Sequence, residues 1–265
     1  KKMAADITVE KTIAKGKYNQ TDLQSSREPS DRAAVADEET ALSTEKLIEK
    51  RIAKEPSVKT NYLELAEYYF DKNNFEKAED AIRRGFEVLK NDTDMKERLL
   101  DAEVRRLHHE LTSTKEAFEA KPDENLKKKF YQLKEQYEAK RLETYEFRVH
   151  EHPGNSAYRF ELGMIYQSAG KFKEAIGQFQ QSKNDVSRKG ISLLALGQCF
   201  QQLKQYKLAL NHYEEAVEAI TEKDSEDKKK ALYLTAKLAY GLKDMKKAES
   251  YATTLGGIDY FYKDI

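Results

Sequence analysis

Residues 159–179 read RFELGMIYQSAGKFKEAIGQF, and residues 193–213 read LLALGQCFQQLKQYKLALNHY. The two segments align without a gap at a spacing of 34 residues. In both, large apolar side chains recur at steps of three and four residues, which is the spacing of one helix face. A short polar or glycine-containing break divides each segment near its middle. The pattern therefore predicts a repeated pair of helices.

The same template fits residues 62–82 and, more weakly, residues 232–252. Small residues stand at two fixed places in all four copies. They are Ala66, Gly163, Gly197 and Ala236 in the first helix, and Ala78, Ala175, Ala209 and Ala248 in the second. Glycine or alanine at a crossing lets two helices approach closely while bulky neighbours fill the space beside them. The copies therefore share one packing scheme as well as one spacing.

This pattern resembles the tetratricopeptide-repeat (TPR) family, whose helix pairs have the same period and the same alternation of small and large residues. Pro56 and Pro153 stand where that family often places a proline, just before the next unit. The resemblance implies an all-α fold, a right-handed superhelical solenoid of antiparallel helix pairs.

Residues 93–155 are too long for one repeat, because they number 63 where 34 are needed. Two runs in this segment step by four and three, as in a heptad seam. They are Leu100, Val104, Leu107, Leu111, Thr114 and Phe118, and then Leu126, Phe130, Leu133, Tyr137, Lys140, Thr144 and Phe147. Pro122 breaks the two runs and Asp123 is a candidate N-cap. We expect an antiparallel coiled-coil hairpin that projects about 22 Å beyond the solenoid.

The tip of this hairpin is basic. Its lysines are Lys115, Lys121, Lys127, Lys128 and Lys129. They are interpreted either as a solvated helix end or as a docking surface for an acidic partner.

These observations give expected boundaries along the chain. Residues 1–42 read as an irregular N-terminal arm or linker, because they are polar and lack a sustained period. The expected units are then 43–92 (a capping helix and the first full repeat), 93–155 (the elongated repeat), 156–189, 190–228 (a repeat with a longer loop) and 229–265 (a C-terminal repeat-like unit). The arm includes Ile7, Val9, Ile13 and Tyr18, which we expect to pack on the helices and screen the binding face.

Composition argues against several classes of function. Lys and Arg together number 47, as do Asp and Glu, so the basic excess typical of nucleic-acid binding is absent. No apolar run approaches the roughly 20 residues of a membrane-spanning helix. Cys199 is the only cysteine, which excludes an intramolecular disulfide. We expect a cytoplasmic protein without direct membrane insertion, although an upstream targeting segment stays open because the sequence begins at Lys1.

Candidates for catalysis or metal binding are few. His108 and His109 are adjacent, and His150 and His152 are two residues apart, so neither pair brings two rings together on a helix. Cys199 is interpreted as a small buried hydrophobe, and Gly256-Gly257 as a helix stop. The sequence therefore predicts no enzyme activity, no cofactor and no metal site.

In the TPR family, positions 2, 5, 9 and 12 of each repeat line a concave binding groove. The resemblance carries this role onto Leu63, Glu67, Phe70, Phe160, Met164, Gln167, Ile191, Leu194, Gln198, Gln201, Tyr233, Lys237 and Tyr240. Leu194 and Ile191 have an alternative interpretation as core between repeats. A carboxylate clamp, as in one TPR sub-family, is disfavoured because Leu63, Glu67 and Glu161 stand at the matching positions.

The function predicted from the sequence is a scaffold or adaptor that binds a protein or peptide in an apolar groove, with the hairpin as a second contact surface. The alternative is a structural subunit whose groove holds its own N-terminal arm or that of a neighbouring copy, which would give self-association.

Overall fold

The computed structural model describes residues 44–222 and 224–263. The chain divides into two units, Lys1–Lys46 and Leu47–Ile265, and the fold below is that of the second. The predicted N-terminal arm, including Ile7, Val9, Ile13 and Tyr18, lies outside the described residues.

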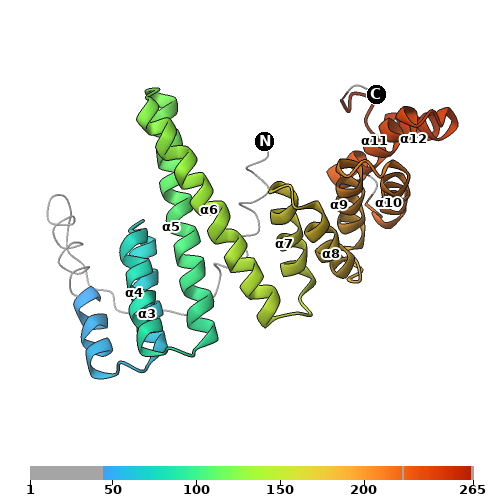
Figure 1. The fold of residues 1–265 in the computed structure, drawn as a ribbon. Coiled ribbons are helices and arrows are strands. Elements are labelled where there is room, and N and C mark those ends of the chain that lie inside the picture. Colours follow the sequence, from blue (N-terminus) through green and yellow to red (C-terminus); the bar gives the residue numbers. More distant parts are fainter. Residues whose placement is uncertain (1–43, 223, 264–265) are drawn as a thin grey trace, which may run out of the picture. The chain divides into compact units, whose positions relative to one another are not determined.

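The described residues form helices and no strand. A helix over residues 44–54 comes first. The helices that follow are α3 (Lys59–Asp71), α4 (Phe75–Val88), α5 (Thr93–Ala120), α6 (Glu124–Glu151), α7 (Ser156–Ser168), α8 (Phe172–Ser182), α9 (Lys189–Gln202), α10 (Tyr206–Ala219), α11 (Glu226–Gly241) and α12 (Met245–Ile258). From α3 to α12, each helix packs on the next one along the chain (Figure 1). The predicted all-α solenoid of helix pairs is confirmed.

The turn between the two helices of a standard unit has the same backbone geometry in all four units. Its left-handed residue is Asn73, Gly170, Lys204 or Lys243, with φ between 56° and 73°. The next residue's N–H donates to a carbonyl five positions earlier, as Asn74 does to Tyr69 and Lys171 does to Tyr166. This bond satisfies a carbonyl in the last turn of the first helix and reverses the chain.

The small residues lie at close helix crossings, as the sequence predicts. A Cβ atom added to Gly197 would lie 2.4 Å from the Tyr213 ring, and one added to Gly163 would lie 2.6 Å from Phe179. Ala175 and Ala209 have no exposed surface. The ring of each unit therefore fills the space that its glycine leaves open.

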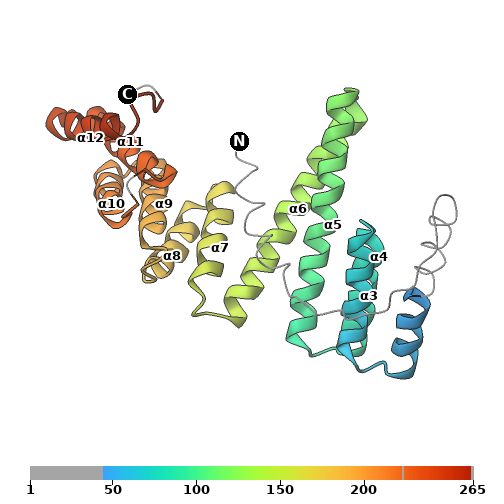
Figure 2. The ribbon, with the colours of Figure 1, turned by 180° about the vertical axis from the view of Figure 1, so that it is seen from behind.

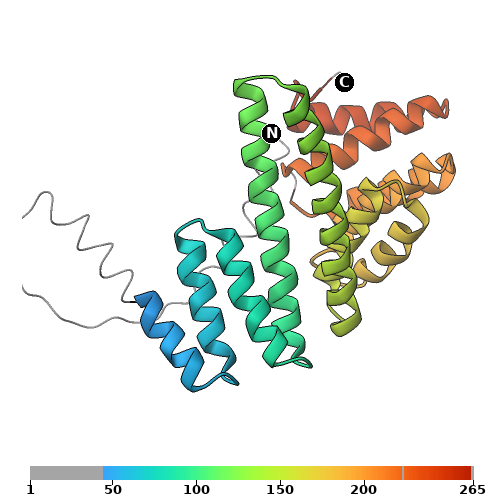
Figure 3. The ribbon, with the colours of Figure 1, turned by 60° about the vertical axis from the view of Figure 1, so that its left-hand side comes forward.

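Helices α5 and α6 are 28 residues long, about twice the length of their neighbours. They lie side by side, and α5 reaches well past the end of α4 (Figures 2 and 3). Leu107, Thr114 and Leu133 are buried between them. The Asp123 carboxylate accepts hydrogen bonds from Asn125 N and Leu126 N, which confirms the predicted N-cap of α6. The interpretation as a coiled coil stays a prediction.

The main apolar packing forms two clusters. One joins the 44–54 helix, α3, α4 and the start of α5, and includes Ile48, Leu65 and Leu99. The other joins helices α7 to α12 and includes Phe179, Leu196 and Tyr213. Helix α6 contributes no residue to either cluster. The polar contacts of α6 are therefore important for holding it against its neighbours.

The expected helix stop at Gly256-Gly257 is wrong. Both glycines lie inside α12, which continues to Ile258. Leu255 has no exposed surface and anchors this last turn to the core, so packing outweighs the low helix propensity of two glycines.

Candidate partner-binding face

The first helices of the units are α3, α5, α7, α9 and α11, here called the A helices. The predicted binding residues on them, here called the face residues, differ in exposure. Glu67, Met164, Lys237 and Tyr240 are exposed. Half-buried are Leu63, Phe70, Phe160, Gln167, Ile191, Gln198, Gln201 and Tyr233. Leu194 is 3% exposed, which agrees with its alternative interpretation as core.

Helices α7 and α9 touch directly and share one part of the face. Gln167 Nε2 donates across this junction to Ala195 O and to Cys199 Sγ, both at 3.4 Å. Phe160 packs against the Phe179 ring, with centroids 5.6 Å apart. These contacts hold Gln167 and Phe160 in place, and Met164 remains 39% exposed beside them.

The face residues of α3 combine apolar and charged side chains. Leu63 and Phe70 pack against the first apolar cluster, while Glu67 is exposed. The Phe70 ring lies 5.8 Å from that of Phe75, and the Arg105 guanidinium lies over it at 4.9 Å. The α5 helix therefore covers part of this surface with a cation.

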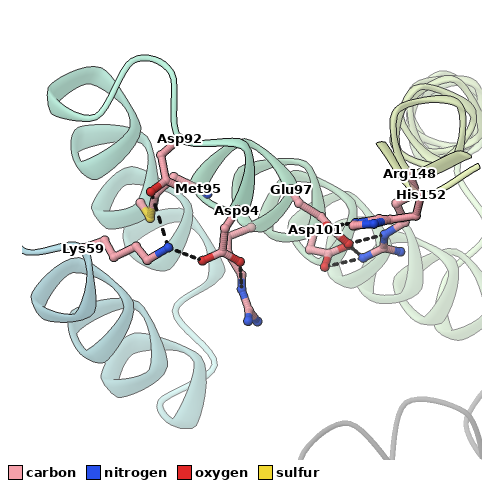
Figure 4. A network of polar contacts seen from close by, with 9 residues as sticks. Lys59, Asp92, Asp94, Met95, Glu97, Asp101, Arg148 and His152 are labelled. Carbon is pink, nitrogen blue, oxygen red and sulfur yellow. Dashed lines mark hydrogen bonds and ion pairs between the residues drawn. The ribbon is translucent and has the colours of Figure 1, made fainter. Parts of the chain in front are cut away.

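Three carboxylates occupy the equivalent positions of α5. Asp94, Glu97 and Asp101 follow Thr60, Leu63 and Glu67 by 34 residues. Lys59 Nζ contacts Asp94 at 3.0 Å and Asp92 at 3.4 Å, which ties α3 to the start of α5 (Figure 4). The α5 part of this face is therefore acidic and ion-paired.

Glu97 and Asp101 belong to a group of contacts around Arg148, near the end of α6 (Figure 4). The Arg148 Nε donates to Glu97 Oε1 at 2.8 Å, and His152 Nε2 lies 3.7 Å from Glu97 Oε2. The guanidinium also lies over the rings of Tyr145, at 5.2 Å, and Tyr158, at 5.4 Å. This Arg148 cluster (Glu97, Asp101, Tyr145, Arg148, His152, Tyr158) joins α5, α6 and α7. Burial raises the pKa of the Asp101 carboxyl above its ordinary value, against the opposing attraction of Arg148.

At the far end, the face residues of α11 are two tyrosines and a lysine. Lys237 Nζ lies 3.1 Å from the Tyr233 hydroxyl, and Tyr240 is 66% exposed. This part of the face is therefore aromatic and basic.

Comparisons with known proteins agree with this architecture. The tetratricopeptide-repeat family model matches residues 192–222, which contain most of α9 and all of α10. The fold is similar to that of a MamA protein (TM-score 0.52, 12% identity), with 78% of this chain and 96% of that chain covered.

Residues 192–222 therefore match a tetratricopeptide repeat, and the chain has the fold of a tetratricopeptide-repeat solenoid.

Two further structures have a similar fold. One is YrrB, described as a TPR protein with an unusual peptide-binding site (TM-score 0.52, 13% identity, covering 81% of this chain and 93% of that chain). The other is the C-terminal part of a TPR repeat-containing protein from Cytophaga hutchinsonii (TM-score 0.52, 15% identity, covering 84% and 92%). At these identities the likeness shows the fold alone. No curated protein matches the sequence.

The structure also places the cysteine and the two adjacent histidines that the sequence analysis considered for catalysis or metal binding. Cys199 has no exposed surface, and burial raises the pKa of its thiol to about 11, so the reactive thiolate is scarce at neutral pH. His109 stacks on Phe75 at 4.4 Å, and His108 lies 5.5 Å from Tyr137, so the adjacent rings have different partners. Within residues 44–222 and 224–263, no group of three or more His, Cys, Asp or Glu residues could hold a metal ion. No helix in the same ranges is long and apolar enough to cross a membrane.

Sequence reasoning missed the acidic positions of α5 because the elongated unit has no partner of equal length to align with. Counting 34 residues on from Leu63 and Glu67 would have placed Glu97 and Asp101. No pattern in the sequence pairs them with Arg148, which lies 47 residues beyond Asp101.

Proposed function

We propose that this TPR protein is a non-enzymatic interaction module that binds a segment of a partner polypeptide along its A helices. The supporting observation is Met164, a large apolar side chain that is 39% exposed between half-buried face residues. Apolar side chains in a row with polar amides suit a bound polypeptide, because its side chains need apolar contacts and its backbone needs hydrogen bonds.

The proposed contact region centres on α7 and α9, with Met164, Ile191 and Gln198 in its middle. The paired carboxylates of α5 form one border of this region, and the lysine and tyrosines of α11 form the other. A partner segment that spans the region would meet acidic, apolar and basic-aromatic surfaces in turn. The long α5–α6 pair is proposed as a second contact surface, because Lys121, Lys128 and Lys129 are exposed at its end.

The test is selection of binding peptides from a random library displayed on phage, followed by affinity measurements with two matched variants. Met164→Lys changes a face residue, and Leu208→Lys changes a residue of α10 that is 47% exposed. We expect Met164→Lys to weaken the selected peptides at least about tenfold, the effect of roughly 1.4 kcal/mol, and Leu208→Lys to leave them unchanged. Equal losses in the two variants, or failure to select any specific peptide, would contradict the proposal.

A further inference from the structure

Two glutamines occupy the same repeat position on neighbouring A helices. Gln167 lies four residues after Gly163 in α7, and Gln201 lies four residues after Gly197 in α9. Both glutamines are half-buried face residues. A carboxamide donates through its nitrogen and accepts through its oxygen, so what each glutamine offers to a ligand depends on which atom the protein already uses.

The internal contacts of Gln167 leave its oxygen free. Its Nε2 donates to Ala195 O and Cys199 Sγ of α9, both at 3.4 Å. The opposite orientation would place the amide oxygen against the Ala195 carbonyl oxygen, and neither of these atoms can donate a hydrogen bond. Gln167 is therefore held with Nε2 toward α9, and its Oε1 remains as an acceptor for a ligand.

Gln201 is held in the opposite sense. Its Oε1 accepts a hydrogen bond of 2.7 Å from the Tyr213 hydroxyl. Tyr213 has no exposed surface, and a hydroxyl group that is buried without an acceptor costs free energy, so this bond orients the amide. The equivalent ring of the preceding unit is Phe179, which has no hydroxyl group. Gln201 therefore presents Nε2 as a donor.

Both free atoms are accessible to a ligand. Neither Gln167 Oε1 nor Gln201 Nε2 has a hydrogen-bond partner within residues 44–222 and 224–263. In the same ranges, the buried side-chain atoms without a partner are Asn61 Nδ2 and His212 Nδ1, so both glutamine atoms reach solvent. Neighbouring A helices thus present one acceptor and one donor at equivalent positions of the face.

We propose that this face binds its partner segment in an extended conformation, with Gln167 Oε1 accepting from a backbone N–H and Gln201 Nε2 donating to a backbone C=O. In an extended segment these backbone groups point sideways and are free to pair. An α-helix uses them internally, so a bound helix would cover both amides and leave them unpaired, which costs free energy.

The two glutamines would select the conformation of the partner, because every residue type carries the same backbone groups. Selection of side chains is left to the apolar residues beside them, such as Met164, which lies three residues before Gln167 and is 39% exposed. The side chains of an extended segment stand roughly perpendicular to its backbone hydrogen bonds, so they can contact Met164 while the backbone contacts the amides. This inference rests on the proposed binding function and adds the conformation of the ligand.

The main test variant is Gln201→Glu. One carboxylate oxygen can still accept from Tyr213, but the other presents an acceptor where Gln201 presents a donor, so it repels a backbone carbonyl. The matched control is Gln202→Glu, which introduces the same charge at the next residue of α9, an exposed position outside the face residues. Tyr213→Phe, which copies Phe179 of the preceding unit, keeps the ring and removes the hydroxyl group that orients Gln201.

The probe is the capped tripeptide acetyl-Val-Leu-Val-amide, which is too short to form a helix. Its binding is followed by NMR through the side-chain NH2 signal of Gln201 and the methyl signal of Met164, each assigned by its loss in Gln201→Glu and Met164→Lys. We expect both signals to shift in the natural protein and in Gln202→Glu. Followed at Met164, the affinity should fall about tenfold in Gln201→Glu and about twofold in Tyr213→Phe, where the amide is free to rotate.

A second probe is the same tripeptide with all three residues N-methylated, which keeps the side chains and loses the backbone donors for Gln167. It should bind the natural protein about fivefold more weakly.

Three results would overturn the inference and leave the proposed function standing: a shift at Met164 without one at Gln201, equal affinities of Gln201→Glu and Gln202→Glu, or equal binding of the two tripeptides. In each case the probe would occupy the face without using the amides. No shift of either signal up to the solubility limit of the probe would also overturn the inference, and the library selection would then decide the proposed function separately.

Discussion

Arg148 Nη2 donates to both carboxylate oxygens of Asp101, at 2.7 and 2.6 Å, and so ties the end of α6 to the first half of α5. The relationship matters because α6 lies between the two apolar clusters and contributes to neither. In a repeat protein each unit contacts only its neighbours, so the junction between units sets how far unfolding stays cooperative. Arg148 takes part in both contacts of α6, because its guanidinium bonds to Asp101 of α5 and lies over the Tyr158 ring of α7.

Arg148→Ala should destabilise the protein by about 2–3 kcal/mol, because it leaves the Glu97 and Asp101 carboxylates without their main cation. It should also split unfolding into two transitions, one for each apolar cluster. Denaturation followed by circular dichroism and by hydrogen exchange would show both effects. The control is Arg98→Ala, which removes a 53%-exposed arginine 3.5 Å from Asp94 and should change stability by less than about 1 kcal/mol. Equal effects of the two variants would argue against a special role for Arg148.

Two glycine substitutions should change the stability of the protein in opposite directions. Gly197→Ala places a Cβ 2.4 Å from the Tyr213 ring and should destabilise the protein by about 1–3 kcal/mol. In Gly177→Ala the new Cβ, in the middle of α8, meets nothing within 4 Å, so it should stabilise the protein by up to about 1 kcal/mol through helix propensity. Thermal melts of both variants would test this. If both variants were stabilised, the helices at Gly197 would be packed less closely than in the structure.

The pair between Glu49 and Arg84 predicts a dependence on pH. Its two hydrogen bonds, of 2.7 and 2.8 Å, join the 44–54 helix to α4. The hydrogen bond from Arg84 lowers the pKa of the Glu49 carboxyl in the folded state. The ionised carboxylate therefore stabilises the fold above its unfolded-state pKa, and this contribution is lost as the pH falls through the folded-state pKa.

The stability difference between the natural chain and Glu49→Gln should accordingly shrink on acidification and vanish once the pH is well below the folded-state pKa of Glu49. Urea denaturation at a series of pH values would measure it. In an Arg84→Ala background the same substitution should show far less dependence on pH. If the pH dependence of the Glu49→Gln stability change persisted in the Arg84→Ala background, a cation other than Arg84 would be its cause.

The outer half of the long helix pair should be dispensable for folding. Replacing residues 108–136 by a four-residue turn removes most of the segment beyond α4, and the two cut ends are close because His108 lies 5.5 Å from Tyr137. The replacement removes the stack of His109 on Phe75, so the cost should be about 0.5–1.5 kcal/mol. Circular dichroism should fall only in proportion to the helix removed. A larger decrease would show that this half supports the rest of the fold.

The periodic residues by themselves determined the helix pairs of this protein. The small residues at Gly163 and Gly197, the cap at Asp123 and the 34-residue spacing are local or evenly repeated signals. Helix periodicity, capping and close crossings depend on residues that are near in sequence or recur at a fixed interval, so one chain is enough to find them.

The tertiary structure alone decided which face residues are available and which are already engaged. Leu194 is buried, the Gln167 side chain donates to Ala195 O of α9, and the Tyr233 ring lies under the Lys263 ammonium group. Arg148 meets Asp101 only because two long antiparallel helices return the chain to its starting level. The same residue types would satisfy the repeat pattern whether they faced solvent or a neighbour. Their burial depends on contacts between residues far apart in the chain, at intervals that the repeat does not specify.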